Sequence, residues 1–131
     1  MKTELGRLVL LVNDYDEAFE FYQKNLGCKK FFDLIDSRGL RYLHVGFHSE
    51  SSAGIWFLKA ESEEEKERVG NQTSGQPVFV IYTDAFDEHL ETLIKNEVTI
   101  VREPEITEEY MLLSFLDLYG NVIVLVQLIN T

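Results

Sequence analysis

Cysteine is nearly absent from this sequence of 131 residues, and long apolar runs are absent as well. With Cys28 as its only cysteine, the chain has no internal disulfide, which favours a reducing compartment, so we expect a cytoplasmic protein. No apolar run approaches the roughly 20 residues that a membrane-spanning helix needs. The apolar stretch within MKTELGRLVLLV lacks the cleavage site of a signal peptide and is interpreted as a first strand.

Basic residues are also scarce, since 12 Lys and Arg stand against 23 Asp and Glu, a formal net charge of −11. A nucleic-acid-binding protein needs basic residues to displace counterions from phosphates, and an anionic membrane surface repels an acidic protein. We therefore expect neither nucleic acid nor membrane as a partner. The acidity favours solubility and is compatible with a cationic ligand.

The residues that are abundant indicate a globular domain, because 45% are apolar and 12% are aromatic. The apolar run 8–12 is typical of a strand that is covered on both faces. Asn13 and Asp14 follow it, and both side chains can cap a helix. An apolar stripe at helical spacing then predicts a helix over about 14–26, which ends at Gly27.

Three strands are predicted next, at about 28–36, 40–47 and 53–59. A run of charged residues over 61–68 and a polar, glycine-rich stretch over 70–75 follow them. Together these two stretches are interpreted as a solvated connection between two halves of the chain.

The same order of elements then repeats. Thr83 and Asp84 are predicted to cap a second helix, and strands are expected at about 78–82, 98–102, 110–117 and 122–129. Aligning Asp14 with Asp84 brings Lys24-Asn25 to within one residue of Lys95-Asn96, an offset of about 70 residues. The repeat predicts an α+β fold of two β-α-β-β-β modules related by a pseudo-twofold axis.

Two stretches of the sequence resemble the vicinal-oxygen-chelate superfamily, which includes glyoxalase I, extradiol dioxygenases and bleomycin-resistance proteins. They are LVLLVNDYDEAFEFYQKNLGCKKFFD and FLDLYGNVIVLVQ, in which Leu118 replaces the usual proline of F-x-D-P-x-G-N-x-x-x-L. The resemblance implies one domain over 1–131, with modules over about 1–60 and 77–131 and a linker over about 61–76. It further implies that each curled sheet forms half of a barrel-like cavity, and that the chain pairs into a homodimer.

The enzymes of that superfamily hold a divalent metal through His, Gln or Glu at four strand positions. Carried over by alignment, these positions fall on Arg7, Trp56, Val78 and Val124. Arginine stays protonated, and the other three side chains offer no lone pair to a hard or borderline ion. We therefore expect no metal and no other cofactor.

Other chemistries find little support. His44 and His48 have the spacing of a ligand pair on a helix, but RYLHVGFHSE reads as a strand ending in a turn. Cys28 is interpreted as a quiet, partly buried thiol despite the lysines beside it, and there is no Gly-x-Ser-x-Gly elbow. Four carboxylates around Pro104 are expected in a solvated loop: Glu103, Glu105, Glu108 and Glu109. No catalytic residue is predicted.

A candidate ligand site comes from the alternation of side chains along strands, which places Arg7, Val9 and Leu11 on one face. If this face lines the cavity, its wall is mostly apolar, with one guanidinium and one indole, as small-molecule sites are. The predicted ligand-binding residues are Arg7, Val9, Leu11, Tyr42, His44, Trp56, Val78, Tyr82 and Val124.

The predicted function is binding of a small aromatic or amphipathic organic molecule without metal, as in antibiotic sequestration. Arg7 favours an anionic group on the ligand, whereas the net charge is compatible with a cation. Two alternatives stay open. One is an enzyme, a lyase or dioxygenase that acts through displaced metal ligands or without metal. The other is a dimerisation or interaction module with a filled cavity.

Overall fold

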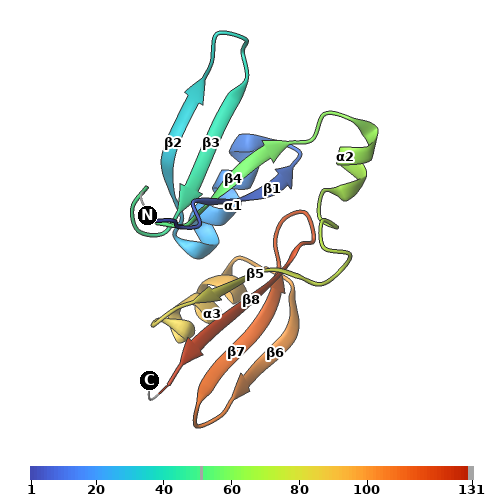
Figure 1. The fold of residues 1–131 in the computed structure, drawn as a ribbon. Helices are drawn as coiled ribbons and strands as arrows, with labels where there is room; N and C mark the ends of the chain where they lie inside the picture. Colours follow the sequence, from blue (N-terminus) through green and yellow to red (C-terminus); the bar gives the residue numbers. More distant parts are fainter. Residues whose placement is uncertain (51, 130–131) are drawn as a thin grey trace. The chain divides into compact units, whose positions relative to one another are not determined.

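The computed structural model describes residues 1–50 and 52–129. The chain divides into two compact units, Met1–Val69 and Gly70–Thr131, and each contains a four-stranded sheet (Figure 1). The predicted repeat of strand, helix and three strands is confirmed in both units. The division falls inside the connection predicted over 61–76, and the single domain expected over 1–131 stays a prediction.

The sheet of the first unit has the strand order β1-β4-β3-β2, with β1 parallel to β4 and the other neighbours antiparallel. Its elements are β1 (Arg7–Val12), α1 (Tyr15–Leu26), β2 (Lys29–Ile35), β3 (Arg41–Gly46) and β4 (Gly54–Lys59).

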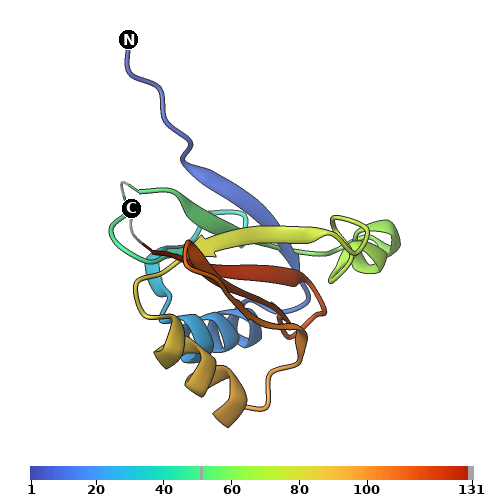
Figure 2. The same ribbon diagram turned by 90° about the horizontal axis from the view of Figure 1, so that it is seen from below.

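Helix α1 begins and ends as the sequence predicts. The side chain of Asp14 accepts a hydrogen bond from the backbone N–H of Glu17 at 2.8 Å, and Gly27 ends the helix in the left-handed conformation. Its apolar stripe packs on β4, where the rings of Tyr22 and Phe57 meet edge to face with centroids 5.4 Å apart. Figure 2 shows the helix on one side of its strands.

A short helix that the sequence did not predict, α2 (Glu63–Arg68), lies within the connection. Ser62 caps it and Glu65 bonds back to the backbone of Ser62, which forms a capping box. None of its residues is buried, so the predicted solvated character is confirmed. The helix was missed because it has no apolar stripe, which is the main sequence signal of a helix.

The sheet of the second unit has the order β5-β8-β7-β6, and α3 packs on β8. Its elements are β5 (Pro77–Tyr82), α3 (Phe86–Lys95), β6 (Ile100–Ile106), β7 (Tyr110–Leu116) and β8 (Val122–Leu128).

The capping predicted for the second helix is right only in part, because the Thr83 hydroxyl accepts a hydrogen bond from the backbone N–H of Ala85 at 3.0 Å, one residue before the helix begins. Ala85 occupies the N-cap position and forms no side-chain capping bond. The first free backbone N–H, on Phe86, donates instead to the side-chain oxygen of Gln127 at 2.9 Å. Gln127 comes from the last strand, so this cap cannot be read from the residues next to the helix.

The predicted loop around Pro104 is partly wrong, because β6 runs through it to Ile106 and contains Glu103 and Glu105. The pairing of β6 with β7 shifts register on both sides of Arg102. Since β6 is an edge strand, a proline without a backbone donor is tolerated there.

Within the described residues, none of the helices is both long enough and apolar enough to cross a membrane.

Candidate functional site on the first unit

Within the described residues of the first unit, α1 packs on one face of the sheet, and we call the opposite face, which α1 does not cover, the open face (Figure 2). The face under α1 is formed by buried residues such as Leu10, Leu43 and Phe57, which pair across neighbouring strands. Because side chains alternate, their neighbours in sequence belong to the open face. The open face is formed by Val9, Leu11, Phe32, Leu34, Tyr42, His44, Trp56 and Leu58.

An aromatic row, defined as Phe32, His44 and Trp56, crosses three strands of the open face. His44 lies directly opposite Phe32 on one side and Trp56 on the other. The ring centroids are 4.3 Å apart for Phe32 and His44, and 5.4 Å apart for His44 and Trp56. Val9 extends the row onto β1, and the ring of Tyr42 lies 6.3 Å from that of Trp56. The planes of neighbouring rings in the row are tilted by 36° and 38°, so the rings pack against one another, and an aromatic ligand can pack against the parts that they leave exposed.

Arg7 lies beside the aromatic row and is held by backbone oxygens. Its Nη1 donates to the carbonyls of Gly6 at 2.9 Å and Ser52 at 3.1 Å, and its Nη2 donates to the carbonyl of Glu50 at 3.0 Å. Its Nε donates to Nδ1 of His44 at 3.0 Å. Among the carboxylates of residues 1–50 and 52–129, none forms an ion pair with this guanidinium, so its charge is not neutralised by a neighbouring anion.

Phe31 fills the space beside Arg7 because β2 shifts register between Lys30 and Phe32. A Cβ at Gly46 would overlap the Phe31 ring, and a Cβ at Gly54 would lie 2.6 Å from the carbonyl oxygen of Val45 and 2.8 Å from the ring, so a larger residue at either position would require this packing to shift. The guanidinium carbon of Arg7 lies 5.1 Å from the centre of this ring. No pattern in the sequence predicts this register shift, and neither Phe31 nor Phe32 was predicted as a site residue.

The imidazole of His44 is held in one protonation state. Burial and the nearby charge of Arg7 lower the pKa of His44, so the ring is neutral at pH 7. Because Arg7 always donates, Nδ1 of His44 must accept, and the single proton of the neutral ring sits on Nε2. Nε2 of His44 and Nε1 of Trp56 are both buried and have no hydrogen-bond partner in the described part of the chain.

Of the site residues predicted on the second unit, some share one face of the sheet, whereas the predicted alternation fails for Val78. Val80 pairs with Val124, and Tyr82 pairs with Val126, so these side chains share one face of their sheet. The register shifts between Pro77 and Phe79, and the alternation predicted for this strand is interrupted at Val78.

Two other groups singled out in the sequence have structural roles. Cys28 is buried, and burial raises the pKa of its thiol to about 12, in agreement with the quiet thiol that we predicted. Glu105 accepts a hydrogen bond from the hydroxyl of Tyr110 at 2.9 Å and lies 3.4 Å from Arg102, so it links β6 to β7. This bond raises the pKa of Tyr110.

Comparison with known proteins agrees with this architecture. The profile of the Glyoxalase/Bleomycin resistance protein/Dioxygenase superfamily matches residues 4–125. The chain belongs to this superfamily. An uncharacterized protein of Shewanella frigidimarina is 30% identical over 133 residues, which cover 98% of this chain and 96% of that protein.

Solved structures show the superfamily fold over nearly the whole chain. The crystal structure of UcmS2 superposes with a TM-score of 0.79 at 26% identity and covers 95% of this chain and 98% of its own. TnmS3, an antibiotic binding protein from Streptomyces sp. CB03234, superposes with a TM-score of 0.76 at 21% identity, with 97% of each chain covered.

The metal site of the superfamily's enzymes does not fit the residues that this member has. The resemblance places the four ligand positions at Arg7, Trp56, Val78 and Val124, and the guanidinium of Arg7 is already bonded to carbonyls and to Nδ1 of His44. Among the described residues, no group of three or more His, Cys, Asp and Glu side chains could hold an ion. A metal cation at these positions would be repelled by the positive charge of Arg7.

Proposed function

We propose that the open face of the first unit binds a small aromatic or amphipathic organic molecule without metal. The observation that carries this proposal is the aromatic row on the open face, whose central residue, His44, is bonded to an arginine that has no carboxylate partner among the described residues. Val9 is 40% exposed and Phe32 36% exposed, so part of this surface is accessible to a ligand. Apolar and aromatic walls with a few oriented polar groups are typical of small-molecule sites.

Binding accounts for the open face better than acid–base catalysis does. His44 is the titratable imidazole on this face, and its Nδ1 is occupied by the Arg7 donor while its Nε2 already carries the proton. A general base needs a free lone pair within reach of the substrate. TnmS3 is a precedent for antibiotic binding on the same fold, and such binding needs no catalytic group. A homodimer, expected from the resemblance, stays a prediction.

The proposal is tested with 8-anilinonaphthalene-1-sulfonate, an amphipathic aromatic probe. Trp56 is the only tryptophan of the chain, so energy transfer from tryptophan to the bound probe reports proximity to the aromatic row. We expect saturable binding that quenches Trp56, and a Phe32→Ala variant that binds roughly 5- to 10-fold more weakly because one stacking surface is lost.

The matched control is Phe47→Ala, since Phe47 is the same residue type, is 38% exposed and lies outside the aromatic row. It should bind the probe as the wild type does. Equal weakening in both variants, or no weakening in either, would contradict binding on the open face.

A further inference from the structure

Two N–H donors of the aromatic row lack acceptors. They are Nε2–H of His44 and Nε1–H of Trp56, both buried, on rings whose centroids are 5.4 Å apart. A buried donor without an acceptor is costly, and most native structures avoid it. Two such donors on directly opposed residues of neighbouring strands therefore indicate a group that supplies lone pairs to both.

The protein fixes the donor character of His44. Arg7 is tied to the carbonyls of Gly6, Glu50 and Ser52, and in this position its Nε donates to Nδ1 of His44. A guanidinium cannot act as an acceptor, so Nδ1 cannot carry the proton of the neutral ring. Arg7 is thus a positioning residue, and its charge also makes the Nε2–H of His44 a stronger donor.

We propose that His44 and Trp56 together bind an acceptor oxygen of the ligand, so that the open face selects aromatic compounds with a carboxylate or carbonyl oxygen. This inference rests on the proposed function. It also decides between the two ligand charges that the sequence left open. An ammonium group has no lone pair to offer the two donors and would be repelled by Arg7, whereas a carboxylate satisfies the donors and is attracted by the charge.

The test uses three probes with the same ring system: 2-naphthoate, 2-methylnaphthalene and 2-naphthylmethylammonium. We expect 2-naphthoate to bind roughly 10-fold or more tightly than 2-methylnaphthalene, because it alone of the two accepts hydrogen bonds. The ammonium compound should bind most weakly. Affinities are measured by calorimetry.

Nuclear magnetic resonance provides a readout at the atoms concerned. The single tryptophan gives one indole N–H signal, which should move downfield with 2-naphthoate and not with 2-methylnaphthalene. The ¹⁵N shifts of His44 should show a proton on Nε2 before and after binding. These measurements use the wild-type protein, so they decide the question even if a variant does not fold.

The variant His44→Phe keeps an aromatic ring and removes the donor. Its preference for 2-naphthoate over 2-methylnaphthalene should fall roughly 10-fold, with binding of 2-methylnaphthalene retained. His48→Phe is the matched control, because His48 is exposed beyond the end of β3 and should leave the preference unchanged.

Equal affinities for all three probes, or an indole shift that is the same with the hydrocarbon, would overturn the inference and leave the proposed function intact. Absence of binding by all three probes would also overturn it. The titration with 8-anilinonaphthalene-1-sulfonate then shows separately whether the open face binds aromatic molecules.

Discussion

Cys28 shows how the surroundings of a single side chain decide its chemistry. Lys29 and Lys30 adjoin it in sequence, but the ammonium of Lys30 lies over the ring of Phe19 and pairs with Asp33 at 3.2 Å. Cys28 itself is 2% exposed, and burial raises its pKa to about 12. The reactive thiolate is therefore stabilised neither by solvent nor by the charge of Lys30, which is engaged elsewhere.

We expect Cys28 in the folded protein to react with a thiol-specific disulfide reagent at pH 8 at least roughly 100-fold more slowly than in urea. Because the folded pKa lies above the ordinary value of 9.0, the folded state retains the proton that the unfolded chain loses. Stability should accordingly decrease as pH rises above about 9. Rapid stoichiometric reaction of the native thiol would contradict this burial.

His44 illustrates how far the position and contacts of a single site residue could be predicted from the sequence. Alternation along β1, β3 and β4 placed Arg7, His44 and Trp56 on one face, and the structure brings them together. The bond from Arg7 to His44 was not predictable, because β4 lies between β1 and β3 and the loop carbonyls of Glu50 and Ser52 aim the guanidinium. Sequence patterns specify which face a side chain occupies, and long-range geometry specifies its partner.

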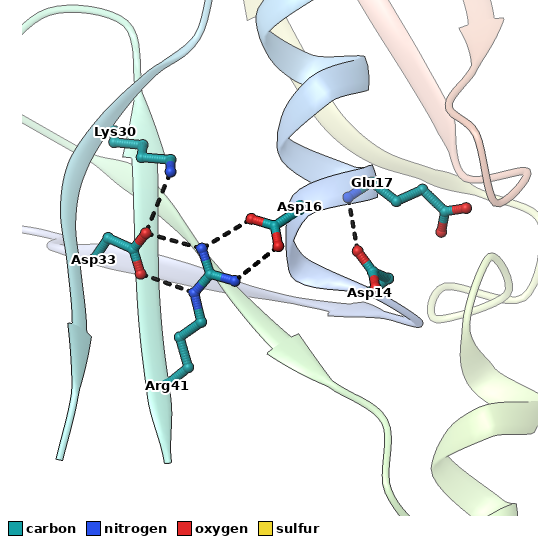
Figure 3. A network of polar contacts seen from close by, with 6 residues as sticks. All are labelled: Asp14, Asp16, Glu17, Lys30, Asp33 and Arg41. Carbon is teal, nitrogen blue, oxygen red and sulfur yellow. Dashed lines mark hydrogen bonds and ion pairs between the residues drawn. The ribbon is translucent and has the colours of Figure 1, made fainter. Parts of the chain in front are cut away.

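At the scale of elements, Arg41 ties helix α1 to the β2–β3 hairpin (Figure 3). Its guanidinium donates to both oxygens of Asp33 on β2 at 2.8 Å, and to those of Asp16 on α1 at 2.9 and 3.1 Å. Hydrogen bonds from Arg41 are the main cause that lowers the pKa of Asp33 to about 2, and they also lower the pKa of Asp16. The paired geometry distinguishes this network from isolated surface ion pairs.

The variant Asp33→Asn should lower the free energy of unfolding by about 1 kcal/mol at pH 7, since the pair is partly exposed and screened by solvent. Because the folded pKa is lowered, this stability is present above the ordinary pKa of 3.8 and is lost as pH falls towards about 2. Urea unfolding at pH 7, 4 and 3 should therefore show a shrinking difference from the wild type. Glu20→Gln, an exposed carboxylate change on α1, is the control, and a difference that is independent of pH would argue against the ion pairs.

The elements that were predicted poorly share a physical cause. Helix α2 consists of charged residues and is stabilised by its capping box, so it has no apolar periodicity. Strand β6 contains Pro104 and runs along a sheet edge, where pairing with one neighbour tolerates residues that strand patterns exclude. Helix α1 and the inner strands were predicted well, because burial on one face imposes a period on their sequences.

At the scale of the whole molecule, the two units repeat an architecture and differ in what their sheets present. The first unit carries the aromatic row and Arg7, whereas the positions with the equivalent strand pairing in the second unit are Arg102, Ser114 and Val124. The repeat in sequence predicted the architecture because backbone pattern was retained. It did not predict this difference in chemistry, which depends on single side chains.

Metal content is the property of the whole chain that separates a binding protein from the enzymes of its superfamily. After incubation of chelator-treated protein with Mn²⁺, Fe²⁺, Ni²⁺ and Zn²⁺ and desalting, elemental analysis should find no tightly bound ion. The reason is that the four family positions carry an arginine and three side chains without lone pairs for a metal. About one ion per chain would contradict the proposed function and favour the enzyme alternative.

The parallel pairing of β1 with β4 has a consequence for how the chain is made. Arg7 pairs with Gly54 and Val12 with Lys59. The first strand, β1, can therefore pair only after β4, the last strand of the unit, has been synthesised. On the ribosome, the β2–β3 hairpin can form first, because its contacts are local, and β1 must wait. Arg7, which lies on β1, forms its hydrogen bonds to His44, Glu50 and Ser52 when this late pairing of β1 with β4 takes place. Assembly of the binding surface therefore coincides with completion of the unit, and a chain stopped before β4 would lack Trp56 and leave β1 unpaired.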